Sequence, residues 1–141
     1  MNPRDFSRLA SELVNATRAA ELRTAISRAY YATYNVSVEM LRDMGFRINR
    51  GPGGHGEVRN YLSNCGDPEV TRVASQLSDL HHKRIRADYD LNRGDVENQT
   101  TARALVEQAR RMIQILDQCR SDPRRTQIVR AMQDWERRIS R

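Results

Sequence analysis

Residues 19–44, with the sequence AAELRTAISRAYYATYNVSVEMLRDM, decide the fold. Apolar side chains recur in this stretch every three or four residues, the spacing that gathers side chains on one face of an α-helix. They are Leu22, Ile26, Ala29, Tyr30, Thr33, Val36, Met40, Leu41 and Met44. Gly45 follows at once, and glycine commonly ends helices because it adopts the left-handed backbone conformation without strain. The stretch therefore predicts one long helix with a buried face.

The same helical spacing continues on both sides of this stretch, and no alternating pattern typical of a strand interrupts it. It predicts a helix near the amino terminus, a helix that starts at Asp67-Pro68 and ends at about Arg84 or Arg86, and a helix that ends near Cys119. Aspartate and proline are preferred at the N-cap and at the first helical position. The positions expected to be buried are Phe6, Leu9, Leu13, Val14, Val70, Val73, Ala74, Leu77, Leu80, Leu105, Val106, Ala109, Met112, Ile113 and Leu116.

One glycine-rich stretch, residues 49–56 with the sequence NRGPGGHG, breaks this pattern. It holds four glycines and a proline in eight residues. Glycine and proline disfavour the interior of both helices and strands, so we predict a mobile loop here. A short helix over residues 57–64 is expected to follow it. Residues 87–94 are predicted to form an irregular turn.

The fold predicted from these elements is an all-α bundle of about five to six helices. The chain of 141 residues is long enough for one domain. Residues 1–120 are expected to form the bundle. Residues 121–141 are expected to form an arginine-rich amphipathic helix that packs on the bundle or on a second subunit. The apolar face of that helix consists of Ile128, Met132, Trp135 and Ile139.

Composition indicates a soluble protein of a reducing compartment. Hydrophobic residues make up 38% of the chain and charged residues 30%, and no apolar run approaches the length of a membrane span. The first residues are polar and amphipathic and lack the apolar core of a signal peptide. Two cysteines, Cys65 and Cys119, do not make a disulfide framework. We therefore expect a cytoplasmic protein that does not interact with membranes.

The positive charge is concentrated toward the carboxyl terminus. The net charge is +6, and Lys83 is the only lysine among 24 basic residues. Residues 103–141 carry ten arginines against five acidic residues, a net charge of +5. Arginine binds phosphate with two parallel hydrogen bonds, so Arg124, Arg125 and Arg130 are candidate contacts for RNA or another polyanion. The competing interpretation is that arginine-rich coding bias supplies these side chains, which then only solvate a helix and pair with nearby acids.

No known metal or catalytic motif is present. His55, His81 and His82 lack the ordered spacing of zinc ligands, and no nucleophile motif of a hydrolase occurs. We therefore expect no metal and no cofactor. The glycine-rich stretch does not match a phosphate-binding motif. Its backbone N–H groups could still bind an anion beside Arg50, His55 and Arg59, and the alternative is a plain connector.

Two stretches combine aromatic with polar residues. In residues 28–35, RAYYATYN, the ring of Tyr30 is expected in the core, whereas Arg28, Tyr31 and Asn35 share a polar face. This face suits either a functional site or an interface. In residues 83–90, KRIRADYD, the candidate binding residues are Arg84, Arg86, Asp88 and Tyr89. The alternative for this second stretch is an ion pair that ends a helix, with the tyrosine packed in the core.

Three segments in this order resemble the HEPN domain superfamily. They are SRAYYA (27–32), HGEVR (55–59) and RADY (86–89), and the similarity to small stand-alone prokaryotic members covers about residues 18–120. The resemblance implies a helical bundle that forms homodimers and binds RNA or a nucleotide. It also implies a place in a toxin–antitoxin, CRISPR or other defence module, with a nucleotidyltransferase or other antitoxin as partner. Many members are metal-independent endoribonucleases.

The ribonucleases of that superfamily carry an arginine followed a few residues later by a histidine near the start of a late helix. No histidine follows Arg84 or Arg86, and only Arg50 and His55 have such a spacing, inside the predicted loop. We therefore expect a protein that binds RNA or a nucleotide. An active endoribonuclease using Arg86 and His55 is one alternative, and a protein-interaction adaptor is another. The side chains expected on one concave polar surface are Arg28, Tyr31, His55, Arg59, Arg86, Asp88 and Tyr89.

Overall fold

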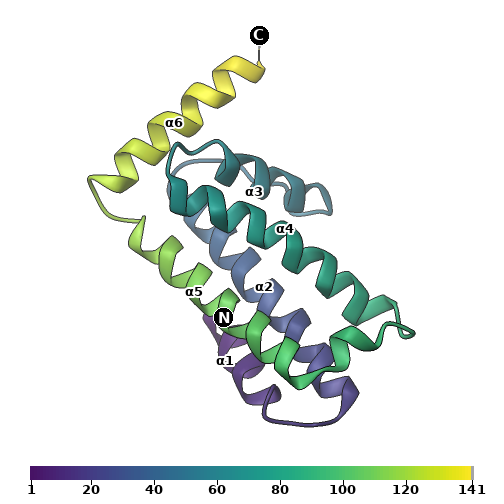
Figure 1. The fold of residues 1–141 in the computed structure, drawn as a ribbon. Helices are drawn as coiled ribbons and strands as arrows, with labels where there is room; N and C mark the ends of the chain where they lie inside the picture. Colours follow the sequence, from purple (N-terminus) through teal and green to yellow (C-terminus); the bar gives the residue numbers. More distant parts are fainter. Residues whose placement is uncertain (141) are drawn as a thin grey trace.

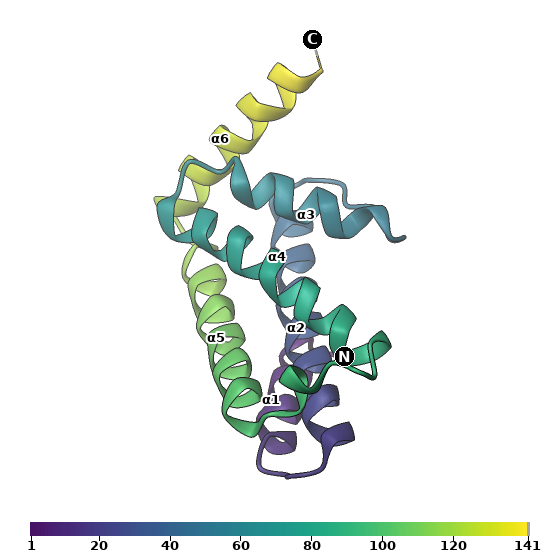
Figure 2. The same cartoon turned by 45° about the vertical axis from the view of Figure 1, so that its right-hand side comes forward.

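Helix α2 (Ala19–Asp43) runs through the middle of the bundle, and every other element except the carboxyl-terminal helix packs against it (Figures 1 and 2). The computed structural model describes residues 1–140. Within these residues it contains six α-helices, one short 3-10 helix and no strand, which confirms the predicted all-α fold. The remaining elements are α1 (Arg4–Leu13), α3 (Gly53–Ser63), α4 (Pro68–Tyr89), η1 (Gly94–Glu97), α5 (Gln99–Gln118) and α6 (Arg124–Ile139). None of these helices is long and apolar enough to cross a membrane.

Because α2 lies at the centre, it buries more than the single apolar face predicted from the sequence. Helices α1, α4 and α5 all pack against it, and α3 and η1 touch it as well. Small residues such as Ala25 and Ala32, which lie between the larger apolar positions, are therefore fully buried. Polar side chains of α2 are buried too, among them Arg23, Ser27 and Thr33. A buried polar group must find a hydrogen-bonding partner, so these side chains constrain what packs beside them.

Helix α1 buries a slightly different face from the one predicted. Leu9 was expected in the core but is 40% exposed, whereas Ala10 is fully buried. The small side chain of Ala10 lets α1 approach α2 closely, and Leu9, one position earlier on the helix, then points about 100° away from the contact. Phe6 and Leu13 still pack against the core as expected.

The glycine-rich stretch is where the prediction of a loop was wrong. Helix α3 already begins at Gly53, so only the first part of the stretch is a turn. Gly54 explains this result, because a Cβ atom there would lie 2.3 Å from the carbonyl oxygen of Asn49 and 2.5 Å from the hydroxyl oxygen of Tyr34. The missing side chain lets the first turn of α3 rest directly on α2 and on the preceding turn. Tertiary packing thus outweighs the low helix propensity of glycine.

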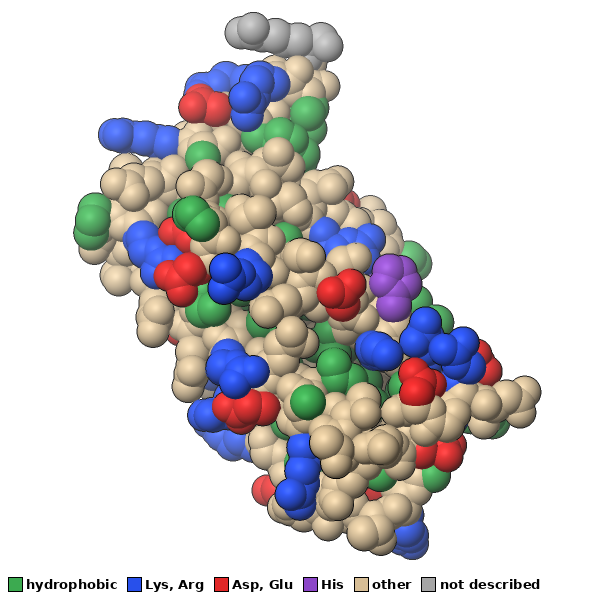
Figure 3. Space-filling view, in the orientation of Figure 1, with side chains coloured by type: hydrophobic (Ala, Val, Ile, Leu, Met, Phe, Trp, Pro, Cys, Tyr) green, Lys and Arg blue, Asp and Glu red, His purple; other side chains and the backbone are tan. Residues whose placement is uncertain are grey.

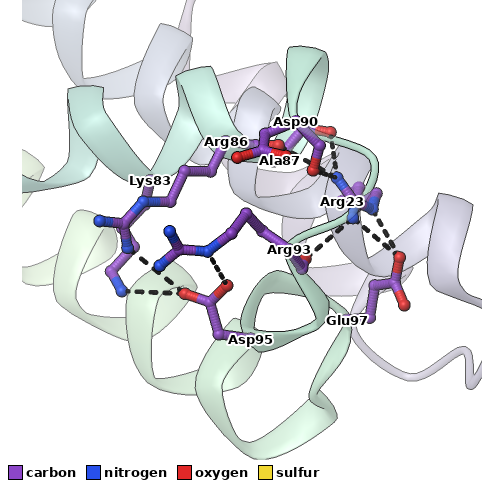
Figure 4. Close-up of polar contacts among 8 residues, drawn as sticks. All are labelled: Arg23, Lys83, Arg86, Ala87, Asp90, Arg93, Asp95 and Glu97. Carbon is purple, nitrogen blue, oxygen red and sulfur yellow. Dashed lines mark hydrogen bonds and ion pairs between the residues drawn. The ribbon is translucent and has the colours of Figure 1, made fainter.

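Helix α4 is longer than predicted because Arg23 caps its carboxyl end (Figure 4). The Arg23 guanidinium donates hydrogen bonds to the backbone carbonyls of Arg86 and Ala87 at 3.0 and 3.1 Å. It also bonds the carbonyls of Asp90 and Arg93, and its Nη2 lies 2.8 Å from a carboxylate oxygen of Glu97. The last carbonyls of a helix have no partner within the helix, and this buried arginine supplies one. Helix α4 therefore extends to Tyr89 instead of ending at Arg84 or Arg86.

Helix α6 packs across the end of the bundle next to α3, and its last turns extend beyond it (Figures 1 and 2). Ile128 and Met132 are fully buried, and the Trp135 ring packs edge-on against Tyr61 with ring centroids 5.2 Å apart. The Tyr61 hydroxyl donates to Glu136 at 2.6 Å. The fourth position of the predicted apolar face, Ile139, is 62% exposed because it lies past the edge of the bundle. Most of the predicted apolar face of α6 therefore packs on the bundle of the same chain.

Replacing Arg23 with lysine tests the cap on α4. Lysine keeps the charge but has no planar fork, so several carbonyls lose their donor. We expect Arg23→Lys to lower the free energy of unfolding by about 2 kcal/mol or more, measured by urea denaturation. Arg18→Ala is the matched control, because the Arg18 side chain is 84% exposed and its ion pair with Glu21 contributes little. Equal stability of the two variants would contradict the role of Arg23.

Replacing Gly54 with alanine tests the close approach of α3 to α2. The added methyl group overlaps backbone and Tyr34, so we expect a loss of about 1–3 kcal/mol of stability. Gly56→Ala provides the opposite control, because no atom lies within 4 Å of the added Cβ atom at this helical position. There alanine should stabilise the protein by up to about 1 kcal/mol. Thermal unfolding of both variants measures the contrast, and a stable Gly54→Ala variant would contradict the packing described.

Candidate functional site

A cavity of about 530 Å³ lies where α2, the turn before α3, α3 itself and α4 meet. Its lining consists of Tyr31, Tyr34, Arg50, Gly51, Pro52, His55, His81 and Arg84. The close approach at Gly54 brings the first turn of α3, and with it His55, over the tyrosines of α2. Figure 3 shows histidine at the surface next to Lys and Arg side chains over the carboxyl-terminal half of α4. The lining makes the cavity both aromatic and cationic, because Tyr31, Tyr34, His55 and His81 supply rings and Arg50 and Arg84 supply positive charge.

The Tyr30 hydroxyl holds the two histidines of the cavity together. It lies 2.5 Å from Nδ1 of His55 and 2.8 Å from Nδ1 of His81. The ring of Tyr30 is buried in the core as expected, with 1% of the residue exposed. Its hydroxyl, however, points out of the core and joins a residue of α3 to a residue of α4.

Aromatic packing fixes the orientation of both imidazole rings. His55 stacks on Tyr34 with ring centroids 4.3 Å apart and an angle of 18° between the planes. His81 meets the ring of Tyr30 edge-on at 4.9 Å, and the two imidazoles are themselves 4.9 Å apart. Each imidazole thus has a hydrogen bond at Nδ1 and a tyrosine ring against it, which together define its position.

Arg84 supplies a positive charge at the edge of this cluster. Its guanidinium lies over the ring of Tyr31, 4.8 Å from the centroid, and donates a hydrogen bond to the Tyr31 hydroxyl. The Arg84 side chain is only 13% exposed and its Nε lies 3.2 Å from Asp88, although without hydrogen-bonding geometry. Asp88 in turn accepts a hydrogen bond from Ser27 of α2 at 3.0 Å. These contacts hold one face of the guanidinium in place beside the histidines.

Burial keeps the three titratable groups of the cluster uncharged at neutral pH, and nearby positive charge adds to this effect for the two histidines. Burial, followed by the charges of His55, Arg59 and Arg84, lowers the pKa of His81 to about 4. Burial, followed by Arg84 and Arg59, also lowers the pKa of His55. Burial raises the pKa of the Tyr30 hydroxyl, which therefore stays protonated. The site presents two neutral imidazoles and a phenol rather than imidazolium ions.

The structure gathers several of the predicted site residues at this cavity. Tyr31, Arg50, His55 and Arg84 line it directly. Arg59 lies one helical turn after His55 and is close enough to lower the pKa of both histidines. Three further predicted residues surround the group formed by Tyr31 and Arg84. Asp88 pairs with Arg84, Tyr89 is exposed with its ring 5.7 Å from the Arg84 guanidinium, and Arg28 lies over the rings of Phe6 and Tyr31.

Two other predicted residues lie away from the cavity. Arg86 pairs with Asp95 of η1 at 3.4 Å, in the group of charges drawn in Figure 4, and the structure does not bring it to His55. The reason is helical geometry, since residues two positions apart on α4 point in directions about 160° apart, and Arg84 takes the inner position. Asn35 donates its side-chain amide back to the carbonyl of Tyr31 and lines a separate hollow near Phe6.

The predicted arginines of the carboxyl-terminal segment are largely engaged in ion pairs within the chain. Arg124 bonds both carboxylate oxygens of Asp67 at 2.8 and 3.0 Å and also reaches Glu69. Arg125 pairs with Asp43 at 2.9 Å. Arg130 is exposed and borders a shallow hollow beside Arg125. The first two arginines attach α6 to the bundle, and a phosphate would have to displace these carboxylates to reach them.

Sequence reasoning missed three residues of the site: Tyr30, Tyr34 and His81. His81 was considered only as a metal ligand and Tyr30 only as a core residue. The signal that could have found His81 is its position three residues before Arg84, which places both on one face of α4. Tyr30 and Tyr34 are likewise one turn apart on α2. No sequence rule predicts that a core tyrosine extends its hydroxyl to both histidines.

Within residues 1–140, no three histidine, cysteine, aspartate or glutamate side chains gather in a way that could hold a metal ion. Comparison with family models, with curated proteins and with solved structures finds no match to this chain.

The low pKa of His81 makes stability depend on pH. Unfolding returns this histidine to a pKa of about 6.5, so between that pH and about pH 4 the unfolded chain binds the extra proton. Stability is therefore expected to fall as the pH drops through this window. We expect urea midpoints measured at pH 6.5 and 4.5 to differ less in His81→Gln than in the wild type. His82→Gln, which changes the exposed neighbour, should keep the wild-type difference, and a similar flattening in both variants would contradict this assignment.

Proposed function

We propose that this chain binds RNA or a nucleotide by placing a phosphate group in the cavity formed by α2, α3 and α4. The observation that carries the proposal is the combination in one cavity of arginine, histidine and tyrosine side chains. Guanidinium groups are the usual partners of phosphate oxygens, because they are always charged and offer several donors in one plane. Arg50 and Arg84 border the cavity, and Arg59 lies close to its histidines.

The tyrosines support a nucleotide as the ligand rather than a free anion. Tyr31 and Tyr34 both line the cavity and are partly exposed, so they add aromatic surface to it, with Arg28 and Arg84 over the Tyr31 ring and His55 stacked on the Tyr34 ring. Proteins that bind single-stranded nucleic acid combine a cationic groove with such aromatic surfaces. The volume of about 530 Å³ falls within the range of small-molecule sites, which suits one nucleotide unit. The HEPN resemblance of the segments that hold these residues agrees with the same class of ligand.

Metal-independent RNA cleavage is a second candidate, favoured by the two neutral histidines. A neutral imidazole can accept a proton from a ribose hydroxyl, and a nearby guanidinium can stabilise the charge that develops on the phosphate. In this version Arg84, rather than Arg86, accompanies His55, because Arg84 lines the cavity and Arg86 pairs with Asp95. The role in a toxin–antitoxin or other defence module follows from the HEPN resemblance and stays a prediction.

A homodimer and a nucleotidyltransferase partner are also implied only by that resemblance. One feature supports a partner at the end of α4, namely a group of exposed apolar side chains. Ile85, Tyr89 and Leu91 are 39%, 72% and 74% exposed. Contiguous exposed apolar side chains often mark a surface that contacts another protein. We therefore propose that the two subunits of the homodimer contact each other here. The adaptor alternative would use the same surface without a nucleic-acid ligand.

Removing Arg50 tests the binding site with little risk to the fold, because this arginine is exposed. We expect Arg50→Ala to weaken binding of a fluorescein-labelled, mixed-sequence RNA decamer about tenfold, the cost of one charge-assisted hydrogen bond. Arg47→Ala removes the same charge from an exposed position that does not line the cavity, and should change affinity less than about twofold at moderate salt. Fluorescence anisotropy measures the affinity of both variants for the RNA. Unlabelled AMP added to the same assay tests whether a single nucleotide competes with the RNA for the site. Equal effects of the two substitutions would contradict the proposed site.

A further inference from the structure

Tyr30 places an unusual constraint on the protons of the two histidines. A phenol has one hydrogen to donate, yet its oxygen lies within hydrogen-bonding distance of Nδ1 of both His55 and His81. The hydroxyl can donate to only one of these nitrogens. The other imidazole must then carry its own proton on Nδ1 and donate it to the phenol oxygen. A neutral imidazole has a single N–H, so the two rings cannot be in the same tautomer.

The consequence for the outer nitrogens of the two rings is a matched acid and base. The ring that accepts from Tyr30 carries its proton on Nε2 and is a donor there. The ring that donates to Tyr30 has a bare Nε2 and is an acceptor there. Both rings line the cavity, and no hydrogen bond in residues 1–140 occupies Nε2 of either one. One hydroxyl thus prepares a proton donor and a proton acceptor without charging either histidine.

We propose that Tyr30 is a catalytic proton relay that couples His55 and His81 into one bifunctional acid–base device for cleaving an RNA phosphodiester. This inference rests on the proposed function, since it requires RNA in the cavity, and it adds Tyr30 and His81 to the reaction. It differs from a pair of independent histidines, which needs one imidazole charged and the other neutral. Here both rings are neutral before and after the step.

The relay balances every proton in the cleavage step. The bare Nε2 takes the proton of the ribose 2′-hydroxyl, and the 2′-oxygen forms a bond to phosphorus while the bond from phosphorus to the 5′-oxygen breaks. The leaving 5′-oxygen takes the proton from Nε2 of the second ring. Tyr30 passes its proton to Nδ1 of that second ring and receives the Nδ1 proton of the first. The products are a 2′,3′-cyclic phosphate and a 5′-hydroxyl, with the two tautomers exchanged.

The exchanged tautomers suit the reverse direction of proton flow, which is what hydrolysis of the cyclic phosphate requires. The ring that has become a base activates water in the place of the departed 5′-oxygen, and the other ring protonates the 2′-oxygen as its bond to phosphorus breaks. A second transfer through Tyr30 restores the starting tautomers. One cleavage followed by one hydrolysis therefore returns the device to its initial state.

The surroundings of the pair favour a neutral device. Arginines face the pair from three segments: Arg59 from α3, Arg84 from α4 and Arg50 from the turn before α3, and the imidazole of His82 on α4 also lies near His81. Tyr34 of α2 covers His55 and is uncharged, since burial raises its pKa. An imidazolium in this setting would repel three arginines, whereas a proton moved between neutral rings changes no net charge. The arginine charges then act on the phosphate alone.

Nitrogen NMR of the protein labelled with ¹⁵N-histidine tests the tautomers without any RNA. We expect one of the coupled histidines to be protonated at Nδ1 and the other at Nε2 at neutral pH. Tyr30→Phe removes only the hydroxyl, and both rings should then adopt the Nε2–H form that isolated imidazole prefers. Tyr61→Phe, which removes a buried hydroxyl at the other end of α3, should keep the wild-type pattern. Identical tautomers for His55 and His81 in the wild type would overturn the relay.

Cleavage of an RNA dinucleoside phosphate tests the catalytic use of the pair. We expect kcat to fall about a hundredfold or more in Tyr30→Phe, with KM nearly unchanged, because general acid–base catalysis contributes factors of this size. The wild-type rate should be flat with pH above neutrality. In Tyr30→Phe the residual rate should fall about tenfold per pH unit there, because that variant needs one charged histidine.

The outcomes separate the two proposals. A Tyr30→Phe variant that cleaves within threefold of the wild-type rate, or wild-type protein that binds RNA without cleaving it, would overturn the catalytic relay while leaving RNA binding intact. Failure of RNA and AMP to bind would overturn the proposed function and, with it, the use of the relay on RNA. The NMR experiment would then still decide whether Tyr30 couples the two histidines.

Discussion

The burial of α2 on nearly all sides is the constraint on which the rest of the molecule depends. A helix enclosed by other helices must satisfy its polar side chains inside the protein, and α2 carries several of them. Arg23 does so by capping the end of α4, and Tyr30 does so by bridging a histidine of α3 and a histidine of α4. The same physical requirement therefore sets the length of α4 and assembles the candidate site.

The site is shared by three segments that are distant in sequence, and each segment has a separate reason for its position. Helix α4 is held by Arg23, the start of α3 is held by the contact at Gly54, and the tyrosines are part of the core helix. A site made this way is rigid where its rings pack, whereas the exposed Arg50 remains free to adapt to a ligand. For the function proposed above, this arrangement would combine precisely placed imidazoles with an adjustable arginine contact to the phosphate.

The helices could be predicted from sequence because apolar spacing reports burial directly. The prediction was wrong where tertiary contact outweighed local preference: at Gly53, where α3 begins inside a glycine-rich stretch, and at Tyr89, where a distant arginine extends α4. Tyr31, Arg50, His55 and Arg84, which line the cavity, were among the residues predicted from their clustering, but Arg86 and Arg84 could not be told apart without the helical register. Tyr30 was assigned to the core, which describes its ring and leaves out its hydroxyl.

Asp67 has two roles, one in capping α4 and one in holding α6, and the first does not depend on the second. Its carboxylate accepts hydrogen bonds from the backbone N–H groups of Glu69 and Val70 at the start of α4 and also pairs with Arg124 of α6. When α6 opens, the ion pair between Asp67 and Arg124 breaks and water solvates the carboxylate. Asp67 still caps the start of α4. Opening of α6 thus leaves the cap of α4 in place, whereas opening of α4 removes the carboxylate that Arg124 of α6 binds. The molecule thus has a hierarchy of cooperative units in which the terminal helix is the outermost.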